Sequence, residues 1–224
     1  MDDRRRYRFP ALMLLLCTAC GPHPSSPVAK AAFEGDAEQV RALIAGGADP
    51  NGAESPLILA ARAGHVTVIQ ILIRAGADPN QRGGVNGWTA LMHAVHKNQE
   101  GAATALLEGG ADPNAYTGHR ETALMMAAGY GRAGMVRILL AHGADPRLRD
   151  VHGASALDNA VSGTLDIDSI TAGSCQTDTV RVLLDAAPDM ALHVYGWPRT
   201  IARIGGCREV LDLLAEKRVS VERP

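Results

Sequence analysis

The sequence predicts an all-α fold, a solenoid of stacked helix pairs with short β-hairpin or turn fingers between them. Two short sequence motifs, each of which we call a phrase, recur with matching spacing along the chain, which is the pattern of a repeat protein. Of the 224 residues 46% are hydrophobic but only 4% are aromatic, so Ala, Leu, Ile and Val must form the core. The 24 glycines and 12 prolines supply turns between short elements.

The first phrase, Gly-Ala-Asp-Pro, marks the end of each helix pair. The aspartates of its four copies are Asp49, Asp78, Asp112 and Asp145, which are 29, 34 and 33 residues apart. Its glycine suits the left-handed turn after a helix, so we expect Gly76, Gly110 and Gly143 to end helices. The Asp-Pro step then prevents the helix from continuing and turns the chain.

The second phrase marks the start of the first helix in each pair. Its copies are Ser55-Pro56-Leu57, Thr89-Ala90-Leu91, Thr122-Ala123-Leu124 and Ser155-Ala156-Leu157. The leading Ser or Thr can cap the free N–H groups of the helix start. In the second helix, apolar residues recur at helical spacing, as at Val68, Ile71 and Leu72. Because one helix pair cannot bury both apolar faces alone, neighbouring pairs must stack.

Two unrelated phrases that both recur about every 33 residues resemble ankyrin repeats. The resemblance covers residues 28–217. It implies about six units with atypical end units: 28–51, 52–80, 81–114, 115–147, 148–188 and 189–217. Where the family usually has His after the second phrase, this chain has Ile58, Met92, Met125 and Asp158. We therefore expect hydrophobic contacts to replace part of the family's hydrogen-bond network.

Three irregularities follow from this alignment. Unit two lacks about five residues between Asn51 and Ser55, which predicts a truncated finger. Unit five carries about eleven extra residues within 162–177, an insertion that either has no function or contacts a ligand. The closing unit has a polar outer face suited to a cap, and residues 218–224 are expected to form a C-terminal tail.

The N-terminus resembles a bacterial lipoprotein signal. Residues 1–19 combine an arginine-rich start, a short apolar run and small residues before Cys20, and the run is too short to span a bilayer. The resemblance implies cleavage before Cys20 and its lipidation, with 20–27 as a Pro-rich linker and Gly21 favouring the outer membrane. The protein would then be periplasmic and membrane-anchored. The alternative is cleavage to a soluble, secreted form.

Charge and motifs argue against several functional classes. The net charge is −2, and no basic footprint for nucleic acid is visible. Residues 129–134 have the spacing of a dinucleotide-binding glycine loop but lack the preceding strand that such a loop needs. His93 and His96 share a helix face but have no third metal ligand in the alignment. We therefore predict a protein that is not an enzyme and has no cofactor.

Cys175 lies in the insertion of unit five, and Cys207 opens the last outer helix. Adjacent repeats stack about 10 Å apart, so a flexible insertion can bring the two sulfurs together. In an exported protein they would form a disulfide that pins the insertion to the cap. Two independent thiols are the alternative.

The family resemblance implies binding of a protein partner by a monomer, through the fingers and the concave face of the first helices. The matching first-helix positions are Leu59, Arg62, His93, His96, Met126 and Tyr130. The matching finger positions are Gln81, Arg82, Trp88, Tyr116, His119, Arg120, Arg149 and His152. Aromatic residues and Arg dominate binding hot spots. Alternative functions are an immunity or inhibitor protein that neutralises a toxin, or a support factor for a periplasmic enzyme such as a catalase.

Overall fold

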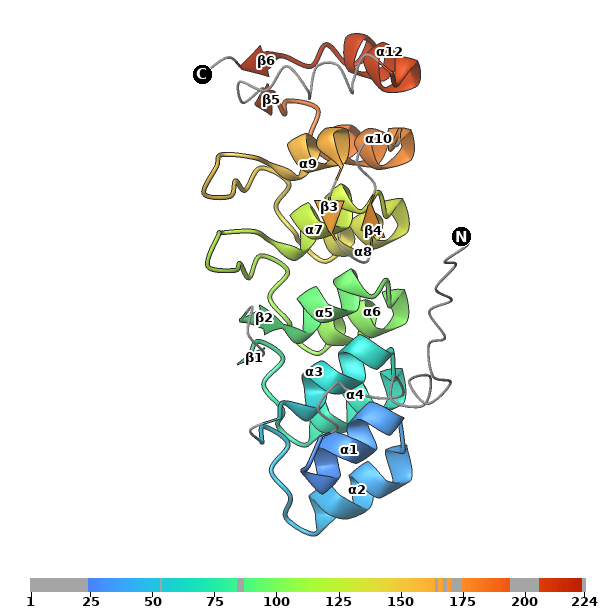
Figure 1. Cartoon of the computed structure of the whole chain (residues 1–224), viewed down its shortest axis with the longest axis vertical. Coiled ribbons are helices and arrows are strands. Elements are labelled where there is room, and N and C mark those ends of the chain that lie inside the picture. Colours follow the sequence, from blue (N-terminus) through green and yellow to red (C-terminus); the bar gives the residue numbers. More distant parts are fainter. Residues whose placement is uncertain are drawn as a thin grey trace, which may run out of the picture.

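The computed structural model is a single stack of helix pairs along one long axis (Figure 1). It describes residues 24–52, 54–83, 87–163, 165–166, 169–170, 175–193 and 206–222. The expected signal peptide (1–19) and Cys20 lie outside these residues. None of the helices in the described ranges combines the length and the apolar character that a membrane-spanning helix requires.

The helix pairs follow one another in chain order. The first helices of the units are α1 (Pro27–Glu34), α3 (Pro56–Ala63), α5 (Ala90–His96), α7 (Ala123–Gly129) and α9 (Ala156–Ser162). The second helices are α2 (Ala37–Ala45), α4 (Val66–Arg74), α6 (Glu100–Glu108), α8 (Ala133–Ala141), α10 (Thr177–Ala186) and α12 (Arg208–Glu216). Each described first helix packs on the next first helix, and each second helix on the next second helix. The predicted solenoid is thereby confirmed.

Short strands form at the fingers and at the closing end. β1 (Arg82–Gly83) and β2 (Trp88–Thr89) are antiparallel in the finger of unit three, and β3 (Leu165–Asp166) and β4 (Ser169–Ile170) are antiparallel in the insertion. β5 (Leu192–His193) pairs in parallel with β6 (Val221–Glu222). Residues 218–222 of the segment expected to be a tail thus fold back, and Val221 and Glu222 pair with the start of the closing unit (Figure 1).

The core runs without interruption along the stack. The paired alanines Ala60, Ala61, Ala127 and Ala128 of the first helices are completely buried, which lets neighbouring first helices approach closely. In the second helices Leu72, Leu106, Leu139 and Leu183 are equally buried. Met92 and Met125, which stand where the family usually has His, belong to the same core and are at most 1% exposed.

A ladder of asparagines joins the turns of successive units. Asn51 donates from Nδ2 to Gly76 O (2.9 Å) and accepts at Oδ1 from Asp78 N (2.7 Å). Asn80 and Asn114 make the same two bonds to the next unit, at 2.7–3.2 Å. Each amide therefore satisfies a backbone donor and a backbone acceptor of the following turn. In the next turn the asparagine is replaced by Arg147, which instead pairs with Asp189 at 2.6 Å.

The helix starts agree with the sequence prediction except in unit two. Thr89, Thr122 and Ser155 each accept a hydrogen bond from the backbone N–H three residues on, at 3.3–3.4 Å. Ser55 makes no such cap and has a φ of 46°. Its N–H donates to Gly52 O (2.8 Å), because the shortened finger must enter α3 through a tight, left-handed turn.

A disulfide joins Cys175 and Cys207 across the last two units. Cys175 precedes α10, and Cys207 is the N-cap residue of α12. The bond therefore holds the starts of two consecutive second helices together. Cys207 is buried, whereas Cys175 lies at the surface.

We expect Asn114→Ala to lower the free energy of unfolding by about 1 to 2 kcal/mol, because the turn at the end of unit four, residues 143–147, loses both of its bonds to Asn114. Urea denaturation measures this change. The exposed Gln70→Ala, on the second helix α4, is the control and should leave the transition nearly unchanged. An unaltered midpoint for the Asn114 variant would show that the ladder does not stabilise the stack.

Candidate partner-binding surface

The candidate surface is formed by the first helices and the adjoining fingers. In Figure 1 the fingers project to one side of the stack, beside the row formed by α3, α5, α7 and α9. Because the repeats stack in register, side chains from equivalent positions of successive units form continuous rows. Two clusters of aromatic and cationic residues lie on this surface.

The first cluster is a row of rings across units three and four. The ring centroid of Trp88 lies 5.3 Å from those of His93 and His96, and the ring of His96 lies 5.8 Å from that of Tyr130. His96 Nδ1 is hydrogen-bonded to the Tyr130 hydroxyl at 2.8 Å. These residues, half-buried and in mutual contact, are positioned before any partner arrives.

Arg132, the N-cap residue of α8 in unit four, lies at the end of this row. Its guanidinium lies 4.4 Å from the centroid of the Tyr130 ring, and it donates to the carbonyls of Val95 and His96 at the end of α5. Arg132 is not among the surface residues that the repeat pattern predicted. Its position in the repeat could have indicated this role. His65 and Gln176 likewise directly precede a second helix, and each contacts the first helix of the preceding unit.

The environment of His93 disfavours its charged form. Burial, followed by the positive charges of Arg62, His96 and Lys97, lowers the pKa of His93 from 6.5 to about 4. His93 is therefore neutral at pH 7 and presents a neutral imidazole beside Trp88. The cationic side chains Arg62 and Lys97 are therefore close enough to His93 to disfavour a further positive charge there.

The second cluster lies on the fingers of units three and four. Tyr116 is 53% exposed, and the centroid of its ring lies 5.8 Å from the guanidinium of Arg82 and 5.9 Å from that of Arg120. The finger is fixed at its base by a bridge between Tyr116 and Thr122 and by a bond from Thr117 N to Glu121 O (2.9 Å). Three sequence-predicted residues thus meet at one place.

A pocket of about 310 Å³ continues the surface between units four and five. Methionines of α7 and polar groups of two fingers line it together. Its lining consists of His119, Glu121, Met125, Met126, Gly129, Tyr130, Asp150, His152, Asn159 and Gly163. The pocket has room for a side chain of a partner.

The remaining predicted residues differ in accessibility. Arg62, His119 and His152 are exposed, and Leu59 and Gln81 are half-buried. Gln81 bonds to Asn51 O (3.2 Å) within the finger ladder. Met126 departs from the expected row: only 4% of it is exposed, because its side chain packs into the core, and it reaches the surface only as lining of the pocket.

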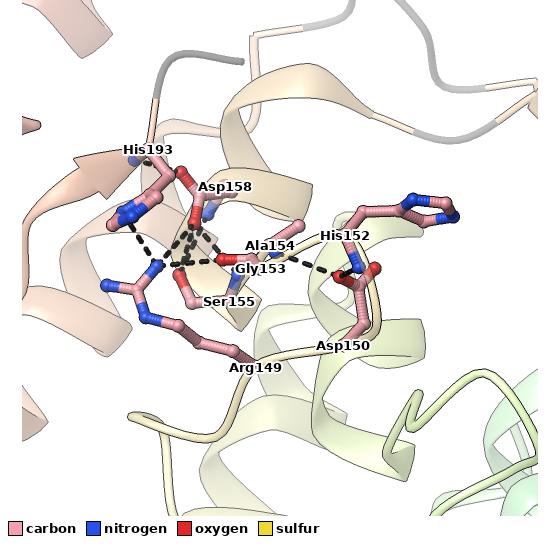
Figure 2. Close-up of polar contacts among 8 residues, drawn as sticks. All are labelled: Arg149, Asp150, His152, Gly153, Ala154, Ser155, Asp158 and His193. Atoms are coloured by element: carbon pink, nitrogen blue, oxygen red, sulfur yellow. Dashed lines mark hydrogen bonds and ion pairs between the residues drawn. The ribbon is translucent and has the colours of Figure 1, made fainter. Parts of the chain in front are cut away.

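Arg149 also departs from the expectation of an outward-facing finger residue. Figure 2 shows it turned toward Asp158, with Ser155 and His193 around the same carboxylate. Arg149 Nη1 donates to Gly153 O and to His193 Nδ1, both at 2.8 Å, and lies 3.8 Å from Asp158 Oδ2. Arg149 therefore stabilises its own finger and the closing unit.

Asp158 is the centre of this group, although it occupies a position where the preceding units have a hydrophobic residue. It is 7% exposed and accepts bonds from Ser155 N (2.8 Å), Ser155 Oγ (2.7 Å) and His193 N (2.6 Å). These bonds connect the start of α9 to β5 (Figure 2). The apolar contacts expected to replace part of the family's hydrogen-bond network therefore do not extend to Asp158.

Ser155, Asp158 and His193 are the residue types of a hydrolase triad, but their connections differ from those of one. A triad needs a serine hydroxyl bonded to an imidazole whose other nitrogen faces the carboxylate. Here the hydroxyl donates to Asp158, and His193 reaches Asp158 through its backbone N–H. Ser155 is also only 1% exposed. The group is arranged to connect two units.

Among the residues that the structure describes, His93 and His96, which share a face of α5, are not part of a metal-binding cluster. Within the described ranges, the structure contains no group of three or more His, Cys, Asp or Glu side chains that is arranged to hold a metal ion. The two histidines instead contact Trp88.

Comparisons with known proteins agree with the repeat geometry. Two family models match, one described as ankyrin repeats (3 copies) over residues 28–117 and one as ankyrin repeats (many copies) over 106–160. An ankyrin repeat-containing protein of Treponema pallidum (strain Nichols) is 41% identical over 69 residues, 31% of this chain. The ankyrin repeat and SOCS box protein 16 of Mus musculus is 32% identical over 111 residues, 47% of this chain. Each match spans 23% of the relative's length.

We expect acid to destabilise the protein partly through His93. Because its folded pKa is depressed to about 4, the unfolded chain binds a proton between pH 6.5 and 4 that the folded chain does not, so stability falls as pH falls through this window. Replacing His93 with Gln should reduce the stability lost between pH 7 and 5 by at most about 2 kcal/mol.

Chemical denaturation at the two pH values measures the effect, and an NMR titration reports the pKa of His93 directly. His142→Gln, an exposed position on the outer side of the stack, is the control. A His93 imidazole that titrates near 6.5 would contradict this account of its environment.

Proposed function

The chain belongs to the ankyrin-repeat family, and from this premise we propose that it binds a partner protein through its fingers and the face of its first helices. Ankyrin-repeat proteins are generally non-catalytic interaction modules. The observation that supports the proposal best is the pair of ring clusters on one side of the stack, around Trp88 and around Tyr116. Aromatic residues and Arg are the types that contribute most to protein interfaces.

Preorganisation supports the same proposal. The half-buried rings contact one another across two units, and arginines of two adjacent fingers lie about 6 Å from the centroid of the Tyr116 ring. Little side-chain freedom is lost when a partner docks on such groups, so more of the contact energy appears as affinity. The pocket beside Tyr130 provides a place where one side chain of the partner can insert.

The proposal also includes export and lipid anchoring. The pattern of residues 1–20 supports it, with Cys20 as the lipidated residue and the periplasmic side of the outer membrane as the location. The disulfide between Cys175 and Cys207 supports export as well, because such bonds persist in oxidising compartments. Since α1 begins at Pro27, the six residues 21–26 that follow Cys20 would reach about 20 Å when extended and would keep the stack close to the membrane.

For the interaction, we expect Tyr116→Ala/Arg120→Ala to lose partner proteins that the wild type captures from the native envelope fraction, because one finger cluster is removed. The control is Arg74→Ala/Arg137→Ala, which removes two exposed arginines from the second helices. Circular dichroism confirms that each variant is folded. Recovery of the same proteins by the wild type and the finger variant would refute the proposed binding surface.

For the anchor, we expect Cys20→Ser to move the protein from the membrane fraction to the soluble fraction, because no acyl chain can then be attached. Mass spectrometry of the wild-type N-terminal peptide should show an acylated Cys20. An unmodified Cys20, or a wild-type protein found entirely in the soluble periplasmic fraction, would refute lipidation.

A further inference from the structure

Charge on the candidate surface differs in sign from charge on the rest of the chain. The first helices and fingers of units two to four span residues 55–63, 81–97 and 115–132. Their cationic side chains are Arg62, Arg82, Lys97, Arg120 and Arg132, and Glu121 is their only acidic residue by sequence. The whole chain has a net charge of −2, so positive charge is concentrated on this face while the remainder is acidic.

The cations are placed where a ligand on the surface would meet them. Arg62, Arg82 and Arg120 are exposed, and they come from three successive units. The depressed pKa of His93 agrees with this placement, because Arg62 and Lys97 are among its causes.

The side chains around Tyr116 suit a carboxylate. Arg82 and Arg120 approach the exposed ring from adjacent fingers, each about 6 Å from its centroid. A guanidinium binds a carboxylate through two parallel N–H donors. A carboxylate near Tyr116 can therefore receive charged donors from two fingers while neighbouring methylene groups pack on the ring.

We propose that the segment bound by this face is an acidic stretch of the partner protein, with carboxylates paired to Arg82 and Arg120 and to Arg62 and Lys97. This inference rests on the proposed function and specifies the chemistry of its partner. The ring row from Trp88 to Tyr130 lies between units three and four and would receive the uncharged side chains that separate the carboxylates. The same charges steer the partner to this face during association.

The test uses the mature full-length chain and three labelled probes in fluorescence polarisation. The probes are a short peptide in which Glu alternates with Leu and Tyr, the same peptide with Gln for Glu, and a single-stranded oligonucleotide of equal charge. We expect the Glu peptide to bind and the Gln peptide not to bind. Because the contacts are ionic, the affinity for the Glu peptide should fall markedly as salt is raised.

The location of the contact is tested with matched charge-removing variants. Arg82→Gln/Arg120→Gln should weaken binding of the Glu peptide by about 10-fold or more. Arg74→Gln/Arg137→Gln removes the same charge from the second helices and should change the affinity for the Glu peptide by less than about 2-fold. Equal binding of the two peptides, no binding of the Glu peptide, equal losses in the two variants, or tighter binding of the oligonucleotide would each overturn the inference.

The outcome separates this inference from the proposed function. If Tyr116→Ala/Arg120→Ala loses its captured proteins but the Glu peptide does not bind, the interaction surface stands and its acidic occupant is refuted. If that variant keeps every captured protein, the proposed surface itself fails, whatever the peptides show.

Discussion

The whole structure depends on one constraint, which is that no helix pair can bury its own apolar faces. Alanines on the first helices and leucines on the second are buried only because the next pair covers them. The asparagine ladder holds the turns at the spacing that this packing requires, since each amide binds both the N–H and the C=O side of the following turn. Stability and shape therefore arise at the junctions between units.

The same constraint builds the candidate surface. His96 and Tyr130 are 34 residues apart in the chain, yet their side chains are hydrogen-bonded, because one stacking step separates them. The rings of Trp88 and Tyr130 and the arginines beside Tyr116 likewise come from different units. A partner would thus contact the seams of the stack, and any change that shifts the stacking also shifts the surface.

The closing end follows a different design, because the repeat pattern is weakest there. Arg147 replaces the ladder asparagine and pairs with Asp189. Asp158 stands where the preceding units have an apolar residue, and it accepts hydrogen bonds from Ser155 and His193. The disulfide from Cys175 to Cys207 and the parallel pairing of β5 with β6 add further connections. Ionic, covalent and strand contacts here add to the helix stacking and take the place of the asparagine ladder.

The sequence by itself determined the architecture, because two phrases at a fixed period specify where each helix begins and ends, and the helix ends at Gly76, Gly110 and Gly143 have the expected positive φ. It also placed Tyr116 and Arg120 on a finger and Trp88 beside α5. Only the tertiary structure decided which side chains face outward. Met126 is buried, Arg149 turns inward and Ser55 does not cap its helix, since these outcomes depend on the neighbouring unit and on finger length, which a single repeat does not contain.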